Sequence, residues 1–154
     1  MTDIVMDHEG FVDKYIGDAI DGVFGAPADD PEHALHAVKA ALAGRSKLHE
    51  MNTAGLAVLH RHKLHQRIGL HTGVGIVGNI GSKRRFNYTV MGDSANLASR
   101  LEGANKFYGT TILASEATVQ LTGTEVVWRE IDTVRVVGRS GLCGSTSQWG
   151  LPVT

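Results

Sequence analysis

Apolar residues recur with two different periods along this chain, so the pattern predicts both strands and helices. Stretches rich in β-branched and aromatic residues, or with apolar residues at every second position, predict strands, and apolar residues three or four positions apart predict helices. Because the two kinds of segment alternate without repeats, we expect an α/β or α+β fold in which helices cover a sheet. The predicted strands are a hairpin within 11–25, then 66–71, 86–91, 110–113 and 126–137; the predicted helices are 1–10, one from 30 onward, 93–109 and 116–121.

Two dipeptides have the composition to turn the first predicted hairpin. Gly17-Asp18 and Asp21-Gly22 each combine glycine with aspartate, as tight hairpin turns often do. The local residues leave the choice between these two turns open.

The long helix after the hairpin has a clear start signal at 30–32. Asp30, Pro31 and Glu32 combine a capping carboxylate, a proline at the first position and an acid in the first turn. We expect this helix to end before the polar stretch around Asn52, and residues 141–154 show no period and predict no element. The face that should pack against a sheet consists of Ala34, Leu35, Val38, Ala41 and Leu42.

Composition limits the classes of partner and compartment. The chain has 154 residues, 42% of them hydrophobic, which suits one globular domain spanning 1–154. Its 15 basic and 16 acidic residues nearly cancel, so we expect no contact with nucleic acid or with a membrane. Cys143 is the only cysteine, and no apolar stretch approaches the roughly 20 residues that cross a bilayer. These features predict a cytoplasmic location for this region, although a parent protein could still be attached to a membrane.

Three motifs in the middle of the chain have simple structural interpretations. GVGIVG at 73–78 has the glycine spacing of a dinucleotide-binding loop, but another strand rather than a helix is predicted after it, which favours a bent strand. The histidines His60, His62 and His65 lack nearby cysteine or carboxylate ligands, so a solvated lead-in to a strand is favoured over a zinc site. KRR at 83–85 is interpreted as an exposed hairpin tip.

Two polar pairs are better candidates for chemistry. Lys14 and Asp18 lie four residues apart around a glycine turn, where a carboxylate can bind a hard cation such as Mg²⁺; the alternative is an ordinary turn aspartate and a surface lysine. Asn96 and Arg100 lie four apart on a predicted helix and share one face. An amide and a guanidinium so placed can bind ribose and phosphate oxygens, and the alternative is a solvated helix face.

Several blocks of the sequence resemble class III adenylate and guanylate cyclases in their order and spacing. The resemblance covers about 11–139, and its last block is specific enough that chance is a poor explanation. The blocks are FVDKYIGDAI at 11–20, VFGAP at 23–27, IGLHTG at 68–73, GNIG at 78–81 and NYTVMGDSANLASRL at 87–101.

The resemblance implies an α+β, ferredoxin-like (βαββαβ-derived) fold that works as a head-to-tail homodimer. The nucleotide sites would lie at the subunit interface, and each would draw on both subunits. The resemblance also implies that Asp18 is one of two aspartates that hold two Mg²⁺ or Mn²⁺ ions. It places the hairpin turn at Gly17-Asp18.

The resemblance further implies that Lys14 and Thr89 contact the base of the substrate. Guanylate cyclases usually have an acid where Lys14 stands and a small polar or thiol residue at the second position. A lysine N–H suits the acceptor N1 of adenine, and a threonine hydroxyl can accept from the adenine amino group. We therefore expect ATP as the substrate, with guanylate cyclase activity as the nearest alternative.

Asn96 and Arg100 match the transition-state residues of the family. The amide would orient the ribose, and the guanidinium would stabilise charge on the α-phosphate while the 3′ hydroxyl attacks and pyrophosphate leaves. Arg139 lies near the place where the family supplies a basic residue to the polyphosphate. The implied reaction converts ATP to 3′,5′-cyclic AMP.

Three features depart from the family pattern. The family's opening strand, with the first metal-binding aspartate, would lie before Met1, so we expect an N-terminally truncated fold and little activity from these residues alone. Asp21 takes a strand position where the family has an apolar residue, and 141–150 lacks the closing strand pattern. A non-catalytic module that binds nucleotide or only dimerises is therefore a second interpretation.

Overall fold

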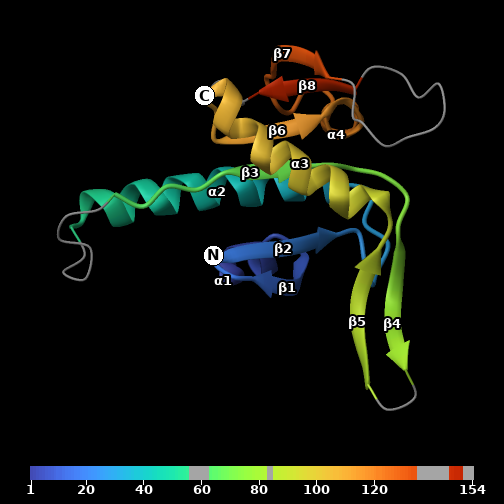
Figure 1. Cartoon of the computed structure of the whole chain (residues 1–154). Helices are drawn as coiled ribbons and strands as arrows, with labels where there is room; N and C mark the ends of the chain where they lie inside the picture. The colour runs from blue at the N-terminus through green and yellow to red at the C-terminus, as the bar shows by residue number, and fades with distance from the viewer. Residues whose placement is uncertain (56–62, 83–84, 135–145, 151–154) are drawn as a thin grey trace. The chain divides into compact units, whose positions relative to one another are not determined.

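The computed structural model describes residues 1–55, 63–82, 85–134 and 146–150 (Figure 1). Its contacts group the chain into two compact units, each of which is described by itself. Unit 1 comprises Met1–Arg67 with Val77–Val90, and unit 2 comprises Ile68–Ile76 with Met91–Thr154. The mixture of helices and mainly antiparallel strands confirms the predicted α+β class. That the chain is a single domain stays a prediction.

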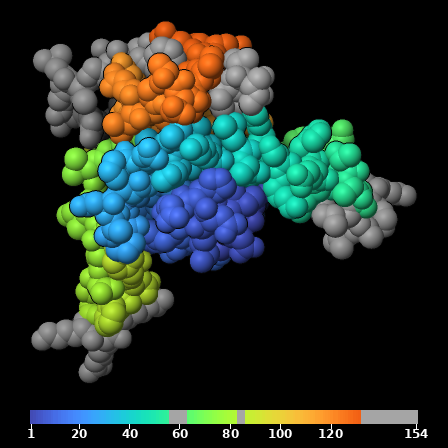
Figure 2. Space-filling model, turned by 180° about the vertical axis from the view of Figure 1, so that it is seen from behind, coloured from blue at the N-terminus to red at the C-terminus, as the bar shows by residue number. Residues whose placement is uncertain are grey.

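Unit 1 begins with a short helix and the predicted hairpin. Helix α1 (Thr2–Asp7) is followed by the antiparallel strands β1 (Gly10–Ile16) and β2 (Ala19–Phe24). The turn between these strands is Gly17-Asp18, where Gly17 has a φ of 64°, so the turn that the family resemblance favoured is confirmed. Figure 2 shows α1, β1 and β2 in blue, gathered against the long helix α2 in cyan to teal.

Helix α2 (His33–Thr53) buries the small residues of its predicted apolar face. Ala34, Val38 and Ala41 are buried, whereas Leu35 and Leu42 are only half-buried. The remaining part of unit 1, Val77–Val90, comes from the hairpin of β4 (Ile76–Ser82) and β5 (Arg85–Met91), whose first and last residues belong to unit 2.

The end of α2 was predicted too early, because the helix continues through Asn52 to Thr53. The amide of Asn52 donates to the carbonyl oxygen of Leu64 at 2.9 Å and accepts from the N–H of Leu64 at 2.8 Å. The hydroxyl of Thr53 donates to the carbonyl oxygen of His49 at 2.9 Å. These polar side chains hold the last turn through contacts that its sequence pattern does not reveal.

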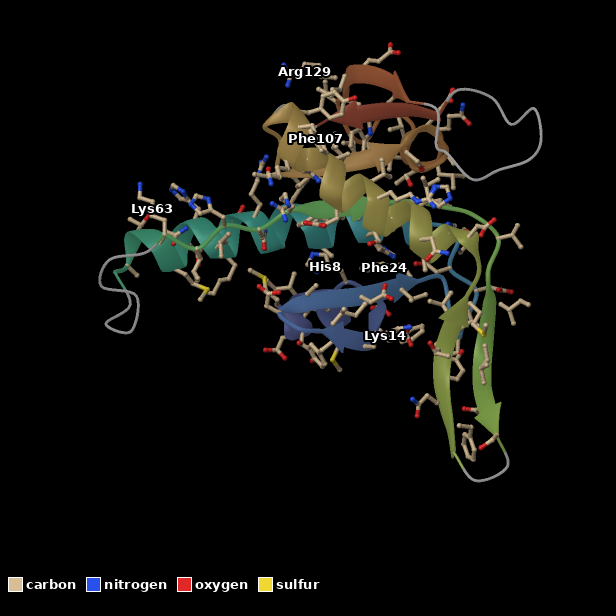
Figure 3. All side chains as sticks on the ribbon, in the orientation of Figure 1. His8, Lys14, Phe24, Lys63, Phe107 and Arg129 are labelled. Atoms are coloured by element: carbon tan, nitrogen blue, oxygen red, sulfur yellow. The ribbon has the colours of Figure 1, made fainter. Side chains whose placement is uncertain are left out.

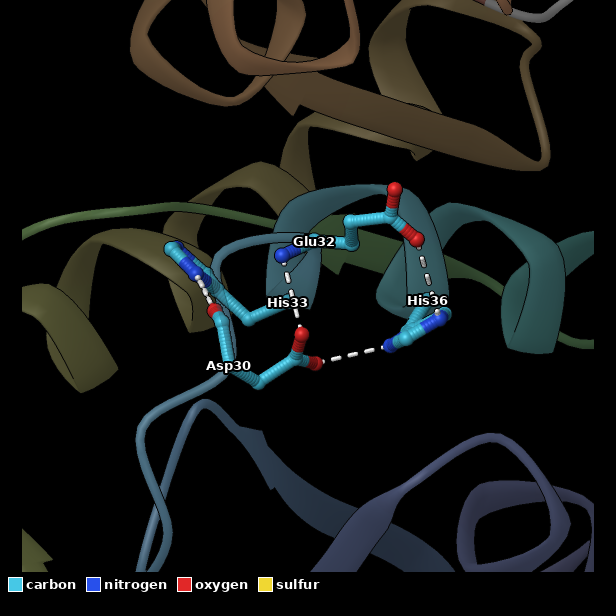
Figure 4. Close-up of polar contacts among 4 residues, drawn as sticks. All are labelled: Asp30, Glu32, His33 and His36. Carbon is cyan, nitrogen blue, oxygen red and sulfur yellow. Dashed lines mark hydrogen bonds and ion pairs between the residues drawn. The ribbon is translucent and has the colours of Figure 1, made fainter.

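Asp30 organises the start of α2 (Figure 4). Its Oδ1 accepts a hydrogen bond from the backbone N–H of Glu32 at 2.9 Å, and its Oδ2 lies 2.7 Å from Nδ1 of His36. Nδ1 of His33 lies 2.7 Å from the backbone carbonyl oxygen of Asp30. Asp30 therefore bonds to Glu32, just before the helix, and to His36, in its first turn. The helix itself begins at His33, and Glu32 is its N-cap.

This cluster predicts an acid-sensitive contribution to stability. The hydrogen bond with His36 is the main reason why the pKa of Asp30 lies below its usual value. A carboxyl group with a lowered folded-state pKa stabilises the fold above its unfolded pKa, and that contribution is lost as the pH falls through the folded-state pKa. We expect Asp30→Asn to lower the melting temperature at neutral pH, with a gap to wild type that narrows toward about pH 3. Thermal unfolding across this range checks it, with Asp29→Asn as control; a gap independent of pH would contradict it.

Unit 2 is built on a four-stranded sheet with the order β3-β6-β8-β7. Strand β3 (Ile68–Leu70) runs parallel to β6 (Ile112–Ser115), and β8 (Thr146–Gly150) is antiparallel to both β6 and β7 (Arg129–Val134). Helix α3 (Asp93–Tyr108) packs against β3 and β6, and α4 (Glu116–Thr122) packs against β6 and β8. The predicted helices at 93–109 and 116–121 are therefore confirmed.

Strand β8 was not predicted, because residues 141–154 show no period. The strand is only five residues long, TSQWG, and it pairs on both sides, with β6 and with β7. Backbone hydrogen bonds to two neighbouring strands can hold a short strand whose sequence shows little alternation of apolar and polar residues. A closing strand is therefore present at Thr146–Gly150, while 141–145 lie outside the described residues.

Asn105, near the end of α3, is a buried polar residue with a structural function. It is 1% exposed, and its amide nitrogen donates to the carbonyl oxygens of Ile68, Leu101 and Glu102 at 3.0 to 3.2 Å. Its amide oxygen accepts from the hydroxyl of Thr110 at 2.7 Å. The side chain of Asn105 thus links the end of α3 to β3 and to the segment that enters β6.

Within the described residues, no helix is long and apolar enough to cross a bilayer.

Candidate functional site

Lys14 and Thr89, predicted to contact a base, lie next to each other in unit 1. The ammonium of Lys14 on β1 donates to the hydroxyl oxygen of Thr89 on β5 at 3.3 Å. Asp13 completes the group, because its Oδ2 lies 2.7 Å from Nζ of Lys14 and accepts from the hydroxyl of Thr89 at 3.0 Å. Figure 3 shows Lys14 on the hairpin. The rings of Phe11 and Tyr88 meet edge to face at 5.5 Å beside this group and pack β1 against β5.

A bulge in β1 explains why Asp13 and Lys14 can act together. The register pairs Val12 with Gly22 and Lys14 with Asp21, so Asp13 is an extra residue without a partner on β2. In a regular strand neighbouring side chains point to opposite faces, whereas a bulge re-aims one of them. The carboxyl group of Asp13 is almost fully buried, with a side chain 1% exposed, and its Oδ1 has no hydrogen-bond partner among the described residues.

Asp21 lies directly across the hairpin from Lys14. Its Oδ2 is 4.0 Å from Nζ of Lys14, and the side chains are 28% and 45% exposed. Partial burial raises the pKa of Asp21, and the charge of Asp13 raises it further, while Lys14 acts in the opposite direction. The hydrogen bond to Asp13 raises the pKa of Lys14 and keeps its ammonium charged. Lys14 therefore remains a charged donor beside two carboxyl groups.

Asp18, the predicted metal ligand, lies in the exposed turn between β1 and β2. A carboxylate in such a turn has the oxygen chemistry that Mg²⁺ prefers, and Mg²⁺ is often held by one or two carboxylates together with substrate phosphates. Among the residues whose structure is described, no three His, Cys, Asp or Glu side chains form a metal-binding group. Asp18 fits such an ion as one contributing ligand, with phosphate oxygens needed for the rest.

Asn96 and Arg100 lie one turn apart on α3 in unit 2, as the spacing predicted. Both are exposed, whereas Leu101 beside them is fully buried. The start of the helix is fixed by Ser94, whose hydroxyl donates to the carbonyl oxygen of Val74 at 2.9 Å. The helix thus presents an amide and a guanidinium on an exposed face while its apolar side is buried. An amide and a guanidinium so presented have the donors to bind ribose and phosphate oxygens.

Other candidate motifs have structural outcomes or fall outside the described residues. GVGIVG at 73–78 leads into strand β4 and not into a helix, so it lacks the geometry of a dinucleotide-binding loop. Arg139 lies outside the described residues, as do His60, His62 and the 83–84 part of the basic tip.

Two acidic neighbours of Lys14 were not identified as site residues from the sequence. Asp13 would have needed the bulge to be foreseen, because strict alternation places it on the opposite face from Lys14. Asp21 carried a signal, since it is an acid where an apolar strand residue was expected. That signal became interpretable only when the register placed it opposite Lys14.

Comparison with known sequences identifies similar proteins. A family model described as the adenylate and guanylate cyclase catalytic domain matches residues 3–149. Adenylate cyclase 1 of Rhizobium meliloti is 41% identical over 139 residues, which is 90% of this chain and 21% of that protein. The terminal-differentiation specific adenylate cyclase of Dictyostelium discoideum is 38% identical over 140 residues, which is 88% of this chain and 6% of that protein. The chain thus spans about a fifth of the first relative and less of the second.

Solved structures share the fold. The adenylyl cyclase CyaB from P. aeruginosa has a TM-score of 0.84 at 28% identity and covers 99% of this chain and 76% of its own. The guanylyl cyclase Cya2 has a TM-score of 0.77 at 31% identity, with 96% and 72% covered. The predicted cyclase fold is therefore confirmed. Because one neighbour is an adenylyl and the other a guanylyl cyclase, the fold alone does not select the nucleotide.

Proposed function

We propose that this chain, which belongs to the family of adenylate and guanylate cyclase catalytic domains, uses ATP and forms 3′,5′-cyclic AMP and pyrophosphate. The observation that carries the choice of ATP is the hydrogen bond of 3.3 Å between Lys14 and Thr89. It brings a charged donor and a hydroxyl together at one place in unit 1. Both sequence relatives named above are adenylate cyclases.

The chemistry of this pair favours adenine over guanine. Lys14 has N–H groups for the acceptor N1 of adenine, and the Thr89 oxygen can accept from the amino group. Guanine has an N–H at N1, so it would place a donor against the ammonium. A mispaired buried polar group costs about 1 to 3 kcal/mol, which corresponds to roughly a tenfold to hundredfold preference.

Asn96 and Arg100 are proposed to act on the ribose and the phosphates. The amide of Asn96 would hold the ribose so that its 3′ oxygen faces the α-phosphorus. As the new oxygen–phosphorus bond forms and the bond to pyrophosphate breaks, the guanidinium of Arg100 would donate to the α-phosphate oxygens, where negative charge increases. The reaction needs no oxidant or second substrate, since the 3′ hydroxyl proton is released and pyrophosphate is the leaving group.

Asp18 is the residue of this chain proposed to hold Mg²⁺ or Mn²⁺. When bound, two such ions would neutralise phosphate charge and favour the ionised 3′ oxygen. The family resemblance also leads us to propose a homodimer in which each site draws residues from both subunits. Arg139 remains a proposed contact to the polyphosphate.

The choice of base is tested by removing the Lys14 donor. We expect Lys14→Met to lower the ratio of adenine to guanine nucleotide affinity by about tenfold or more, because N1 of adenine loses its partner. Binding of 3′-deoxy-ATP and 3′-deoxy-GTP, which lack the attacking hydroxyl, is measured by calorimetry with Mg²⁺ present. Lys39→Met, which removes an exposed lysine from α2, is the matched control. An unchanged ratio, or a wild-type preference for guanine, would refute the proposed base recognition.

A non-catalytic module is the second candidate, and the same titrations separate it from an enzyme. Binding that requires Mg²⁺ and is lost in Asp18→Asn supports a catalytic type of site. Binding of nucleotide without any dependence on Mg²⁺ or Asp18 supports a binding module, and no binding at all supports a dimerisation module. Cyclic AMP formation from ATP is then measured directly with Mg²⁺ present.

A further inference from the structure

The group around Lys14 offers three acceptor groups to the three N–H donors of its ammonium. Asp13 and Asp21 place two carboxyl groups within 4.0 Å of Nζ of Lys14, and Thr89 adds a hydroxyl oxygen at 3.3 Å. An ammonium has three N–H donors. Among the described residues, contacts with Asp13 and Thr89 use two of them, so one remains for a further acceptor.

Asp21 is placed to attract that remaining donor. It is the direct cross-strand partner of Lys14, so both side chains lie on the same face of the hairpin. The distance of 4.0 Å is too long for a hydrogen bond but within the range of an ion pair. Both side chains are partly exposed, at 28% for Asp21 and 45% for Lys14, so an approaching ligand can reach this donor.

We propose that Asp21 is a positioning residue that competes with the nucleotide base for the third N–H of Lys14. This inference rests on the proposed function, in which that N–H donates to N1 of adenine. A carboxylate attracts an ammonium N–H more strongly than a neutral ring nitrogen does. The base must therefore draw Lys14 away from Asp21, and adenine binds more weakly than it would without this carboxylate.

The size of the effect follows from the exposure of the pair. Ion pairs between partly exposed side chains contribute little, so removing the competitor is expected to tighten adenine binding by about twofold to fivefold. The change should affect KM and leave kcat nearly unchanged, because the base is distant in the nucleotide from the reacting phosphorus.

The experiment compares Asp21→Asn with wild type using 3′-deoxy-ATP and its 1-deaza analogue, both with Mg²⁺. The 1-deaza analogue has a C–H in place of N1, so it controls for the general effect of removing a negative charge near a polyanion. We expect Asp21→Asn to tighten the 3′-deoxy-ATP complex by about twofold to fivefold relative to the analogue, and Asp21→Glu to resemble wild type. Equal changes for both nucleotides, or weaker binding of 3′-deoxy-ATP, would overturn the proposal.

A second measurement tests the ion pair without any nucleotide. The carboxyl carbon of Asp21 and the Cε signal of Lys14 are followed by NMR as the pH is lowered, and we expect them to shift together. The charged groups that act on Asp21 are Asp13 and Lys14 of β1. Helix α1, which packs against β1, carries Asp3 and Asp7, and α2, which packs against β2, carries His33 and His36 at its start. The Asp21→Asn variant separates their contributions, because the Lys14 shift that follows Asp21 should be lost.

The two measurements distinguish failure of this inference from failure of the proposed function. Independent titration of Asp21 and Lys14 would overturn the inference even if adenine nucleotides bind. If neither nucleotide binds to any variant, the proposed function and the competition both fail, while joint titration would still establish the ion pair itself.

Discussion

Replacing Arg100 with alanine is expected to lower kcat for cyclic AMP formation by about 10² to 10³-fold, the effect of removing one donor from a developing negative charge. The guanidinium is exposed on α3, one turn after Asn96, while Leu101 of the same helix is buried. The substitution therefore changes an exposed face and leaves the packed side of the helix intact. Turnover is measured as cyclic AMP formed from ATP with Mg²⁺ present.

Two variants on α3 make this prediction specific. Arg100→Lys keeps the charge but loses the planar fork of donors, so its kcat should fall between those of wild type and Arg100→Ala. Lys106→Ala removes an exposed cation from the same helix and should leave kcat nearly unchanged. If Arg100→Ala raises KM alone, or lowers kcat no more than Lys106→Ala does, Arg100 does not act in the transition state.

Gly69→Ala is expected to reduce the free energy of unfolding by about 3 kcal/mol or more, at the upper end of the range for overpacked sites. A Cβ at this position on β3 would collide with the backbone carbonyl oxygen of Ala98 and the backbone nitrogen of Glu102 on α3. These are backbone atoms of a helix, so they cannot rotate aside as a flexible side chain can. Urea unfolding followed by circular dichroism measures the change.

Gly103 provides the matched control within α3. Apart from its chain neighbours and the backbone of its own helix, no atom of the described residues lies within 4 Å of the position that its Cβ would take. Alanine is a better helix former than glycine by about 1 kcal/mol, so Gly103→Ala should raise stability slightly. If Gly69→Ala is no more destabilising than this control, the close contact between β3 and α3 is not a constraint on stability.

Much of unit 1 and unit 2 could be predicted from local signals. Helix α3 has an apolar stripe and ends at Gly109, whose φ of 63° matches the left-handed cap that glycine favours. The turn at Gly17-Asp18 needed the family resemblance, because Asp21-Gly22 had the same local composition. Strand β8 could not be predicted, since its pairing with β6 and β7 is not encoded in a local period.

Only those candidate site residues that belong to the family motif could be predicted from the sequence. The resemblance brought Lys14 and Thr89 together across 75 positions of sequence, and the structure places them 3.3 Å apart. Asp13 could not be added, because its orientation depends on a one-residue bulge. The roles of these residues, and those of Asp18, Asn96 and Arg100, stay predictions that the variants above test.

The bulge in β1 has a consequence for how this chain can vary. Asp13 is an extra residue between Val12 and Lys14, whereas Lys14 and the residues after it pair regularly with β2 up to the turn. Deleting Asp13 would restore regular pairing with Lys14 still opposite Asp21, but it would remove the carboxyl group that binds both Lys14 and Thr89. The extra residue therefore belongs to the proposed recognition site, because a regular strand would have no position for this carboxyl group beside Lys14.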